Sequence, residues 1–397
     1  MKSLITFLLF TTIVFHSQGQ STTFFKSDQI NFQNKKFRLF GHEDIEQNIV
    51  QGHNLDKGSQ LEFRLSYYDK NGVIMREYSP KLGFDDVSIF NSSIGLMNEL
   101  FLEGKGDSPF GRANFSCGFQ KDGRLIWKHA DSLIIGLLKP FNDSDYYGRM
   151  KILSSHSKYD EGDYMVEIND SGQIKLAIQL RTVVGDSLVV DAGMSQIRQI
   201  LFSGSRKYIL FSNKLGDQNA IAYSKNDGIS WEIMPLPEIL FFQLDNYSIF
   251  LGTMTGRIGS ARYLLKQYTL DLQEKMNFEG EMGEFNSISG SLVFHNGGLF
   301  SFVSNHTDSS WNLTDQRLNF YSHHGIKKRV CRYSLSVGEF DIGIPQPTRD
   351  NGILIYASPR DWAPYNSGLM KTDSLGLVYN TDVICDCKDY NTGIGEQ

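Results

Sequence analysis

Five aspartates occupy similar positions in segments that we expect to be loops between the second and third strands of a repeated β unit. They are Asp107, Asp160, Asp217, Asp308 and Asp361, and four of these segments also carry a nearby aromatic residue, Phe110, Tyr159, Trp311 or Trp362. Aromatic faces suit stacking on sugar rings, and carboxylates accept hydrogen bonds from hydroxyl groups. These aspartates, with Trp311 and Trp362, therefore form a candidate ligand face for a carbohydrate. A purely local role is the alternative, because Asp bonds its own backbone in any loop and a repeat inherits it without function.

The same acidic face also permits an enzyme. A glycoside hydrolase needs two carboxylates roughly 5–9.5 Å apart beside a pocket, whereas a binding surface needs no such pair. The sequence does not show whether any two of these acids meet, so the catalytic residues of this alternative are unknown.

Other chemistry has little support in the sequence. Histidine pairs at metal-ligand spacing, a Gly-x-Ser-x-Gly elbow and glycine-rich phosphate loops are all missing from it. We therefore predict no metal site and no cofactor. Of the four cysteines, Cys385 and Cys387 form a C-x-C motif whose two thiols share one face of a strand. In an oxidising compartment one of these two cysteines can form a disulfide with Cys331. The alternative is that the cysteines remain free, half-buried thiols.

A hairpin pattern recurs along the chain and must position these loops. Alternating apolar runs flank a short polar turn, usually with glycine, as in Cys117 to His129 and Ile221 to Ile233, and a copy without glycine runs from Tyr268 to Phe278. The turn glycines are Gly72, Gly123, Gly172, Gly228, Gly325 and Gly376, with gaps of 51, 49, 56, 97 and 51 residues. The gap of 97 spans two periods, since the glycine-less copy lies within it.

A period near fifty residues with two further strand-like runs before each hairpin is typical of propeller blades. We therefore predict an all-β fold, a seven-bladed β-propeller of four-stranded antiparallel blades, with all six glycines in third-to-fourth-strand turns. Closing the ring also removes free sheet edges, and Thr22 to Phe25 are expected to latch onto the last blade.

One hairpin carries a more specific motif. Ser224-Lys225-Asn226-Asp227-Gly228-Ile229-Ser230-Trp231 resembles the Asp-box of sialidase-type propellers, with Asn226 where that family has Asp. The resemblance implies a turn in which the residue-226 side chain bonds turn amides, Gly228 takes a positive φ, and Trp231 packs between sheets. It supports the fold and implies little about activity, because the family places this box away from its catalytic face. The Arg-Ile-Pro motif of sialidases is missing, although Arg149, Arg198, Arg257 and Arg349 lie near expected inner strands.

The first nineteen residues read as a signal peptide. Lys2 precedes an apolar run from Leu4 to Phe15, and Ser17 and Gly19 fit a cleavage site that leaves Gln20 as the new N-terminus. Residues 20–387 then form a single propeller domain, and residues 388–397 a flexible tail. We expect an exported protein that is periplasmic, on the cell surface or secreted, without a membrane span.

The net charge and the distribution of basic residues limit the classes of partner that we expect. The net charge is −6, and the basic residues do not cluster, which argues against nucleic acid. The favoured hypothesis is a non-catalytic binding or scaffold module for a glycan or protein. The alternative is a glycoside hydrolase or lyase acting on the second-to-third-strand loop face, and a part of a larger surface assembly is a third hypothesis. The oligomeric state stays open.

Overall fold

The computed structural model consists almost entirely of β-strands. It describes residues 24–28, 36–56, 61–142, 144–154, 156–185, 196–213, 218–236, 239–244, 248–255, 262–279, 286–288, 293–295, 299–307, 313–322, 324, 326–335, 341–342, 345–358, 367–378 and 383–390. No helix among these residues has both the length and the apolar character that crossing a membrane requires.

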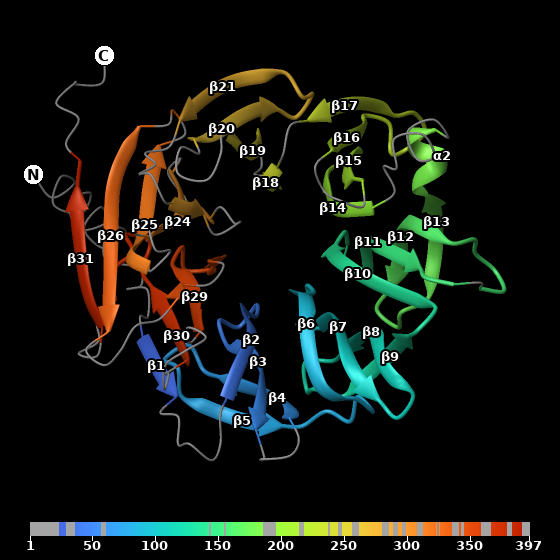
Figure 1. Ribbon diagram of the computed structural model, residues 1–397, viewed down its shortest axis with the longest axis horizontal. Coiled ribbons are helices and arrows are strands. Elements are labelled where there is room, and N and C mark those ends of the chain that lie inside the picture. The colour runs from blue at the N-terminus through green and yellow to red at the C-terminus, as the bar shows by residue number, and fades with distance from the viewer. Residues whose placement is uncertain are drawn as a thin grey trace, which may run out of the picture.

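Seven small antiparallel sheets form a ring, with their first strands nearest the ring axis (Figure 1). The protein is thus a seven-bladed β-propeller, as the repeat predicts. The first five blades pair their strands in chain order from the axis outward, so their loops of one kind gather at one end of the ring.

The first three blades are regular. Blade 1 contains β2 (Lys36–Glu43), β3 (Ile49–Asp56), β4 (Leu61–Tyr68) and β5 (Ile74–Tyr78). Blade 2 contains β6 (Asp85–Ile94), β7 (Leu100–Ser108), β8 (Gly111–Phe119) and β9 (Leu125–Ala130). Blade 3 contains β10 (Leu133–Pro140), β11 (Asp145–Ile152), β12 (Gly162–Asn169) and β13 (Ile174–Gln179), followed by the short helix α2 (Leu180–Val184).

Blades 4 and 5 keep the four-stranded plan. Blade 4 contains β14 (Gln196–Ser203), β15 (Arg206–Ser212), β16 (Asn219–Ser224) and β17 (Glu232–Leu236). Blade 5 contains β18 (Ile239–Leu244), β19 (Ser248–Thr255), β20 (Arg262–Thr269) and β21 (Glu274–Glu279).

The last two blades depart from this plan. In blade 6 the inner position is split between β22 (Asn286–Ile288) and β23 (Val293–His295), followed by β24 (Leu299–Thr307), β25 (Leu313–Ser322), β26 (Lys327–Leu335) and an added edge strand, β31 (Val383–Asp389). In blade 7 the inner position is split between β27 (Asp341–Ile342) and β28 (Gln346–Pro347), followed by β29 (Ile353–Ser358), β30 (Ser367–Thr372) and the N-terminal strand β1 (Phe24–Asp28).

The two chain ends therefore complete different blades. β1 pairs with β30 as the outermost strand of blade 7, which closes the ring near the place where the sequence suggested a latch. β31 pairs with β26 and includes Lys388 and Asp389, so ordered structure continues two residues past the expected start of the tail. Residues 391–397 lie outside the described residues.

The hairpin glycines are confirmed in the first four cases. Gly72, Gly123, Gly172 and Gly228 join third and fourth strands with φ between 75° and 89°, a conformation that suits residues without a Cβ. In the glycine-less copy, Leu272 takes this role with φ 59° between β20 and β21. Gly325 lies outside the described residues.

The prediction for Gly376 is wrong. Gly376 follows β30, but the next strand, β31, joins blade 6 instead of pairing with β30. The reason is competition for one sheet edge, because β1 already occupies the outer side of β30. A regular spacing in the sequence cannot reveal that an N-terminal strand takes this place.

The apolar core lies between blades. Leu65 of blade 1, for instance, shares a fully buried cluster with Leu102 and Phe115 of blade 2. The helix α2 extends the cluster between blades 3 and 4 through Leu180, Val183 and Val184. Each blade is thus stabilised by its neighbours, which fits a closed ring.

The turn after β16 has the contacts expected from its sequence. The Asn226 side-chain oxygen accepts a hydrogen bond from the Ser230 backbone N–H at 3.0 Å, and Gly228 has φ 89°. Trp231 is mostly buried against the cluster between blades 3 and 4. The hairpin is therefore a packed turn.

Candidate functional site

The inner strands of blades 1 to 5 share an irregularity next to the ring axis. Each has a register shift against its second strand, a β-bulge that leaves at least one residue unpaired. The unpaired residues are, from blade 1 to blade 5, Leu39; Asp86, Val87 and Phe90; Leu137 with Leu138; Arg198; and Leu240. Asp86 and Val87 belong to a separate shift at the start of β6. Arg198 is the one basic residue among these unpaired positions. A departure from the repeat at an axis-facing bulge points to a local role.

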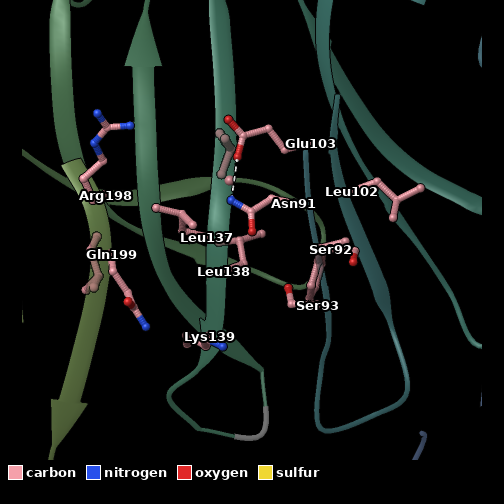
Figure 2. A pocket seen from close by; sticks show the side chains of 14 residues that line it. Asn91, Ser92, Ser93, Leu102, Glu103, Leu137, Leu138, Lys139, Arg198 and Gln199 are labelled. Atoms are coloured by element: carbon pink, nitrogen blue, oxygen red, sulfur yellow. Dashed lines mark hydrogen bonds between the residues drawn. The ribbon is translucent and has the colours of Figure 1, made fainter. Parts of the chain in front are cut away.

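A pocket of about 210 Å³ lies beside this arginine, and we call it the axial pocket. Its walls come from β6, β7, β10 and β14, that is, from blades 2, 3 and 4 (Figure 2). Many of its side chains are polar or charged, namely Asn91, Ser92, Ser93, Glu103, Lys139, Arg198 and Gln199. The volume is below the roughly 300–1,000 Å³ of pockets that enclose drug-sized ligands, so it fits one small group.

Glu103 is the carboxylate of this pocket, and it is already neutralised. It forms a largely buried ion pair with the Arg149 guanidinium and accepts a 3.3 Å hydrogen bond from the Asn91 amide. Gly136 makes room for it, because a Cβ at residue 136 would lie 1.9 Å from a Glu103 carboxylate oxygen. The close approach of β7 and β10 thus depends on a glycine facing a glutamate.

Two cations in the pocket have no carboxylate partner among the described residues. Lys139 and Arg198 are both exposed side chains, on β10 and β14. Surrounding protein removes part of the water around Lys139, and this desolvation lowers the pKa of its ammonium group. Since Glu103 is paired with Arg149, the pocket carries a net positive charge in a chain whose overall charge is −6.

The backbone before Arg198 is held from both sides. The Ile197 N–H donates to the buried Asp163 carboxylate at 2.7 Å, and the Ile197 carbonyl accepts from Arg149 at 3.1 Å. The Arg198 Nε donates to the Ser212 hydroxyl at 2.7 Å, and among the described residues neither terminal guanidinium nitrogen has a hydrogen-bond acceptor. This support fixes the direction of the guanidinium group before a ligand arrives.

Two groups near the pocket, Asp163 and His42, have shifted pKa values. Desolvation raises the pKa of Asp163, against the opposing charge of Arg149 and the hydrogen bond from Ile197. His42 of β2 contacts the Ser92 hydroxyl at 2.8 Å, and desolvation together with the charge of Lys139 lowers its pKa to about 4. His42 is therefore neutral at pH 7 and adds no charge to the pocket.

The axial pocket lies away from the residues that the sequence singled out. Asp107 is near the end of the β6–β7 ladder where it pairs with Asp85, while the pocket uses residues 91–93 and 101–103 toward the other end. Asp107 lies 4.0 Å from Arg112, and Asp160 is an exposed residue of the loop before β12. Neither lines the pocket. The other five predicted residues, Asp217, Asp308, Trp311, Asp361 and Trp362, lie outside the described residues.

The aromatic residues near Asp107 and Asp160, Phe110 and Tyr159, differ in how far they are exposed to solvent. Phe110 is fully exposed at the β7–β8 turn. Tyr159 stacks on His156 with ring centroids 5.5 Å apart and meets Tyr164 edge-on, so it is packed within its own blade. The described part of the loop face thus gives limited support to a stacking platform.

Arg149 and Arg198 are two of the four arginines that the sequence places near inner strands, the others being Arg257 and Arg349, and the sequence assigns no role to any of them. A signal was present, since Arg198 is the one basic residue among the unpaired positions of the first five inner strands. Recognising it requires the bulge register, which the sequence does not show.

The cysteines form one disulfide, between Cys331 and Cys387. The sulfurs of Cys331, Cys385 and Cys387 all lie within 4.8 Å of one another, the kind of grouping that holds a soft metal ion. Two of these sulfurs are bonded to each other, so this oxidised state does not offer three thiolates.

Comparisons with known proteins support the fold. No family model matches the sequence, and no curated protein matches it. Among solved structures, the β-propeller domain of the Trilobed protease from Pyrococcus furiosus is similar, with TM-score 0.54, 11% identity, and coverage of 91% of this chain and 98% of that one. A prolyl endopeptidase matches with TM-score 0.54 and 9% identity over 90% of this chain. This chain spans 50% of the length of that endopeptidase. At such identities the likeness concerns the propeller fold alone.

Proposed function

We propose that the protein is an exported, non-catalytic binding propeller that takes an acidic glycan end group in the axial pocket. The observation that carries the proposal is the unbalanced positive charge of Lys139 and Arg198 beside the paired Glu103. Arginine and lysine recognise carboxylates and other oxyanions through charge-assisted hydrogen bonds. Neutral amides and hydroxyls from Asn91, Ser92 and Gln199 suit the hydroxyl groups of a sugar.

The same pocket favours binding over hydrolysis. A two-carboxylate mechanism needs an acid and a second carboxylate beside the scissile bond. The lining of the axial pocket has one carboxylate, Glu103, and Arg149 neutralises it. Export rests on the N-terminal sequence, and it brings the protein to where acidic glycans are encountered.

The test is calorimetric titration at low salt with three ligands: glucuronate, glucose 6-sulfate and glucose. We expect binding of at least one of the two acidic sugars, with glucose at least tenfold weaker, because it lacks the anionic group. The two acidic ligands separate a carboxylate from a sulfate as the preferred anion. If none of the three binds, the proposal is wrong for sugars, and a protein with an acidic surface becomes the better candidate partner.

Two variants and a control locate the site. Arg198→Gln and Lys139→Gln should each raise the Kd of the acidic sugar about tenfold or more, which corresponds to about 1.4 kcal/mol or more. Arg112→Gln is the matched control, because Arg112 is an exposed arginine beside Asp107, near the opposite end of blade 2. Equal losses in all three variants would indicate nonspecific attraction of anions and contradict the pocket.

A further inference from the structure

Three cysteine sulfurs gather at the outer edge of blade 6. Cys331 on β26 lies directly opposite Cys387 on β31, and the two form the disulfide. Cys385 is two residues before Cys387, on the same face of β31, and is a free thiol. Its sulfur lies 3.5 Å from that of Cys387. A free thiol therefore stands next to a disulfide that could accept its attack.

The three clustered cysteines differ in their exposure to solvent. Cys331 is fully buried, while Cys385 and Cys387 are partly exposed. The Cys387 sulfur, 3.5 Å from that of Cys385, is thus also the more accessible of the two disulfide sulfurs.

We propose that this cluster is a thiol–disulfide exchange site that releases the covalent tether of the C-terminal strand. The Cys385 thiolate attacks the Cys387 sulfur, and a Cys385–Cys387 bond forms as the Cys331–Cys387 bond breaks. The electron pair leaves on the Cys331 sulfur, which takes up the proton that Cys385 lost. One disulfide is exchanged for another, so no oxidant or reductant is consumed.

The exchange is coupled to the position of β31. In the starting state β31 is held by its ladder with β26, by the Arg329–Asp389 ion pair and by the disulfide. Residues two apart in a flat strand have Cα atoms about 6.7 Å apart, at the upper limit for a disulfide. Because a Cys385–Cys387 bond requires β31 to bend, it forms together with loosening of the strand from blade 6.

The surroundings of Cys385 set the speed of the reaction. Burial raises the pKa of its thiol, as do the charges of Asp373 and Asp386, while Arg329 on β26 opposes them. Tyr333 of β26 also faces Cys385, with its own pKa raised so that it stays uncharged. The thiolate is therefore scarce at pH 7, and the exchange should accelerate about tenfold per pH unit until the thiol titrates.

The first experiment asks whether the product bond can exist. Cys331→Ser is oxidised with glutathione disulfide, unfolded in acid and its free thiols counted by mass spectrometry after labelling with N-ethylmaleimide. We expect one free thiol, the core residue Cys117, and a Cys385–Cys387 disulfide. Free thiols or glutathione adducts at both residues 385 and 387 would overturn the proposal.

The second experiment follows the exchange in the full chain. Wild-type protein is held at pH 7, 8 and 9, quenched in acid, unfolded and labelled, and the labelled cysteines are identified after cleavage at Asp386. We expect label at Cys331 to grow with time and with pH at the expense of Cys385. Cys385→Ser should never label at Cys331, and Cys117→Ser should behave as wild type. Label confined to Cys117 and Cys385 at every pH overturns the proposal, even if the Cys331→Ser variant fails to fold.

Discussion

Two groups of charged side chains in this propeller contrast in how their charges are balanced. Between blades 1 and 7, Lys371 is completely buried, with its Nζ 2.8 Å from Glu43 and 3.1 Å from Asp350. Between blades 2, 3 and 4, Glu103 is paired with Arg149, and Lys139 and Arg198 are left exposed in the axial pocket. The first group is closed to solvent and its cation is fully paired. The second is open and has cations in excess.

The difference suggests different roles for the same residue types. Burial raises the pKa of Asp350, but the Thr348 hydrogen bond and the Lys371 charge outweigh it, so that the carboxyl has a lowered pKa. That group of residues joins β2 to the last blade and holds the ring shut. In the axial pocket the charges that remain unpaired are available to a ligand. Three measurements test whether the two groups differ in this way.

The largest expected effect comes from removing the cation of the closed group. Lys371→Met should lower the free energy of unfolding by about 3–5 kcal/mol, because it leaves Glu43 and Asp350 without their buried partner. Urea denaturation measures the loss. The matched control is Lys175→Met, whose side chain is 45% exposed in its pair with Asp145 and which should cost at most about 1 kcal/mol. Similar losses in both variants would remove the structural basis of the contrast.

An intermediate effect should appear with pH. His42 lies on β2 between the two groups, and its pKa falls from 6.5 in the unfolded chain to about 4 in the folded one. The folded state therefore binds fewer protons, and the stability present above pH 6.5 is lost as the pH falls toward 4, by about 3 kcal/mol.

His42→Gln should keep the contact with Ser92 and lose this part of the pH dependence. Urea denaturation midpoints at pH 7, 5.5 and 4 test this expectation, with the pH dependence of the variant compared with that of the wild type. The difference is needed because His129 also has a pKa lowered by desolvation and contributes to both proteins. Parallel pH profiles would mean that His42 is protonated as easily in the folded protein as in the unfolded one.

The smallest effect on stability is expected in the open group. Arg198→Gln should change the free energy of unfolding by no more than about 0.5 kcal/mol, since the side chain is exposed and has no carboxylate partner among the described residues. The same variant should lose affinity for an acidic sugar, while Lys371→Met should keep that affinity as long as it is folded. A large loss of stability in Arg198→Gln would make this arginine a structural residue.

The fold was largely predictable because it depends on local, repeated signals. Gly72, Gly123, Gly172 and Gly228 mark turns that need a positive φ, and their spacing sets the blade period. The prediction failed at Gly376, where β1 had already taken the sheet edge, because this competition between strands from opposite ends of the chain leaves no local pattern.

The candidate site was much less predictable. Arg198 could be placed on an inner strand from the sequence, yet its role depends on a bulge, on Asp163 and Arg149 holding Ile197, and on the pairing of Arg149 with Glu103. These contacts join four strands from three blades. The aspartate pattern, in contrast, marked loops, and its two described members, Asp107 and Asp160, do not line the axial pocket.

The repeat, the turn positions and the alternation of apolar and polar residues follow from the amino-acid sequence, because each of these is encoded within a few neighbouring residues. The pairing of the cysteines, the strands that complete the last two blades and the charges that stay unpaired beside the ring axis become apparent in the three-dimensional structure. Those outcomes depend on distances between residues far apart in the chain. Charge balance in particular cannot be read from composition, since a chain with an overall charge of −6 still presents a positive pocket where its blades meet.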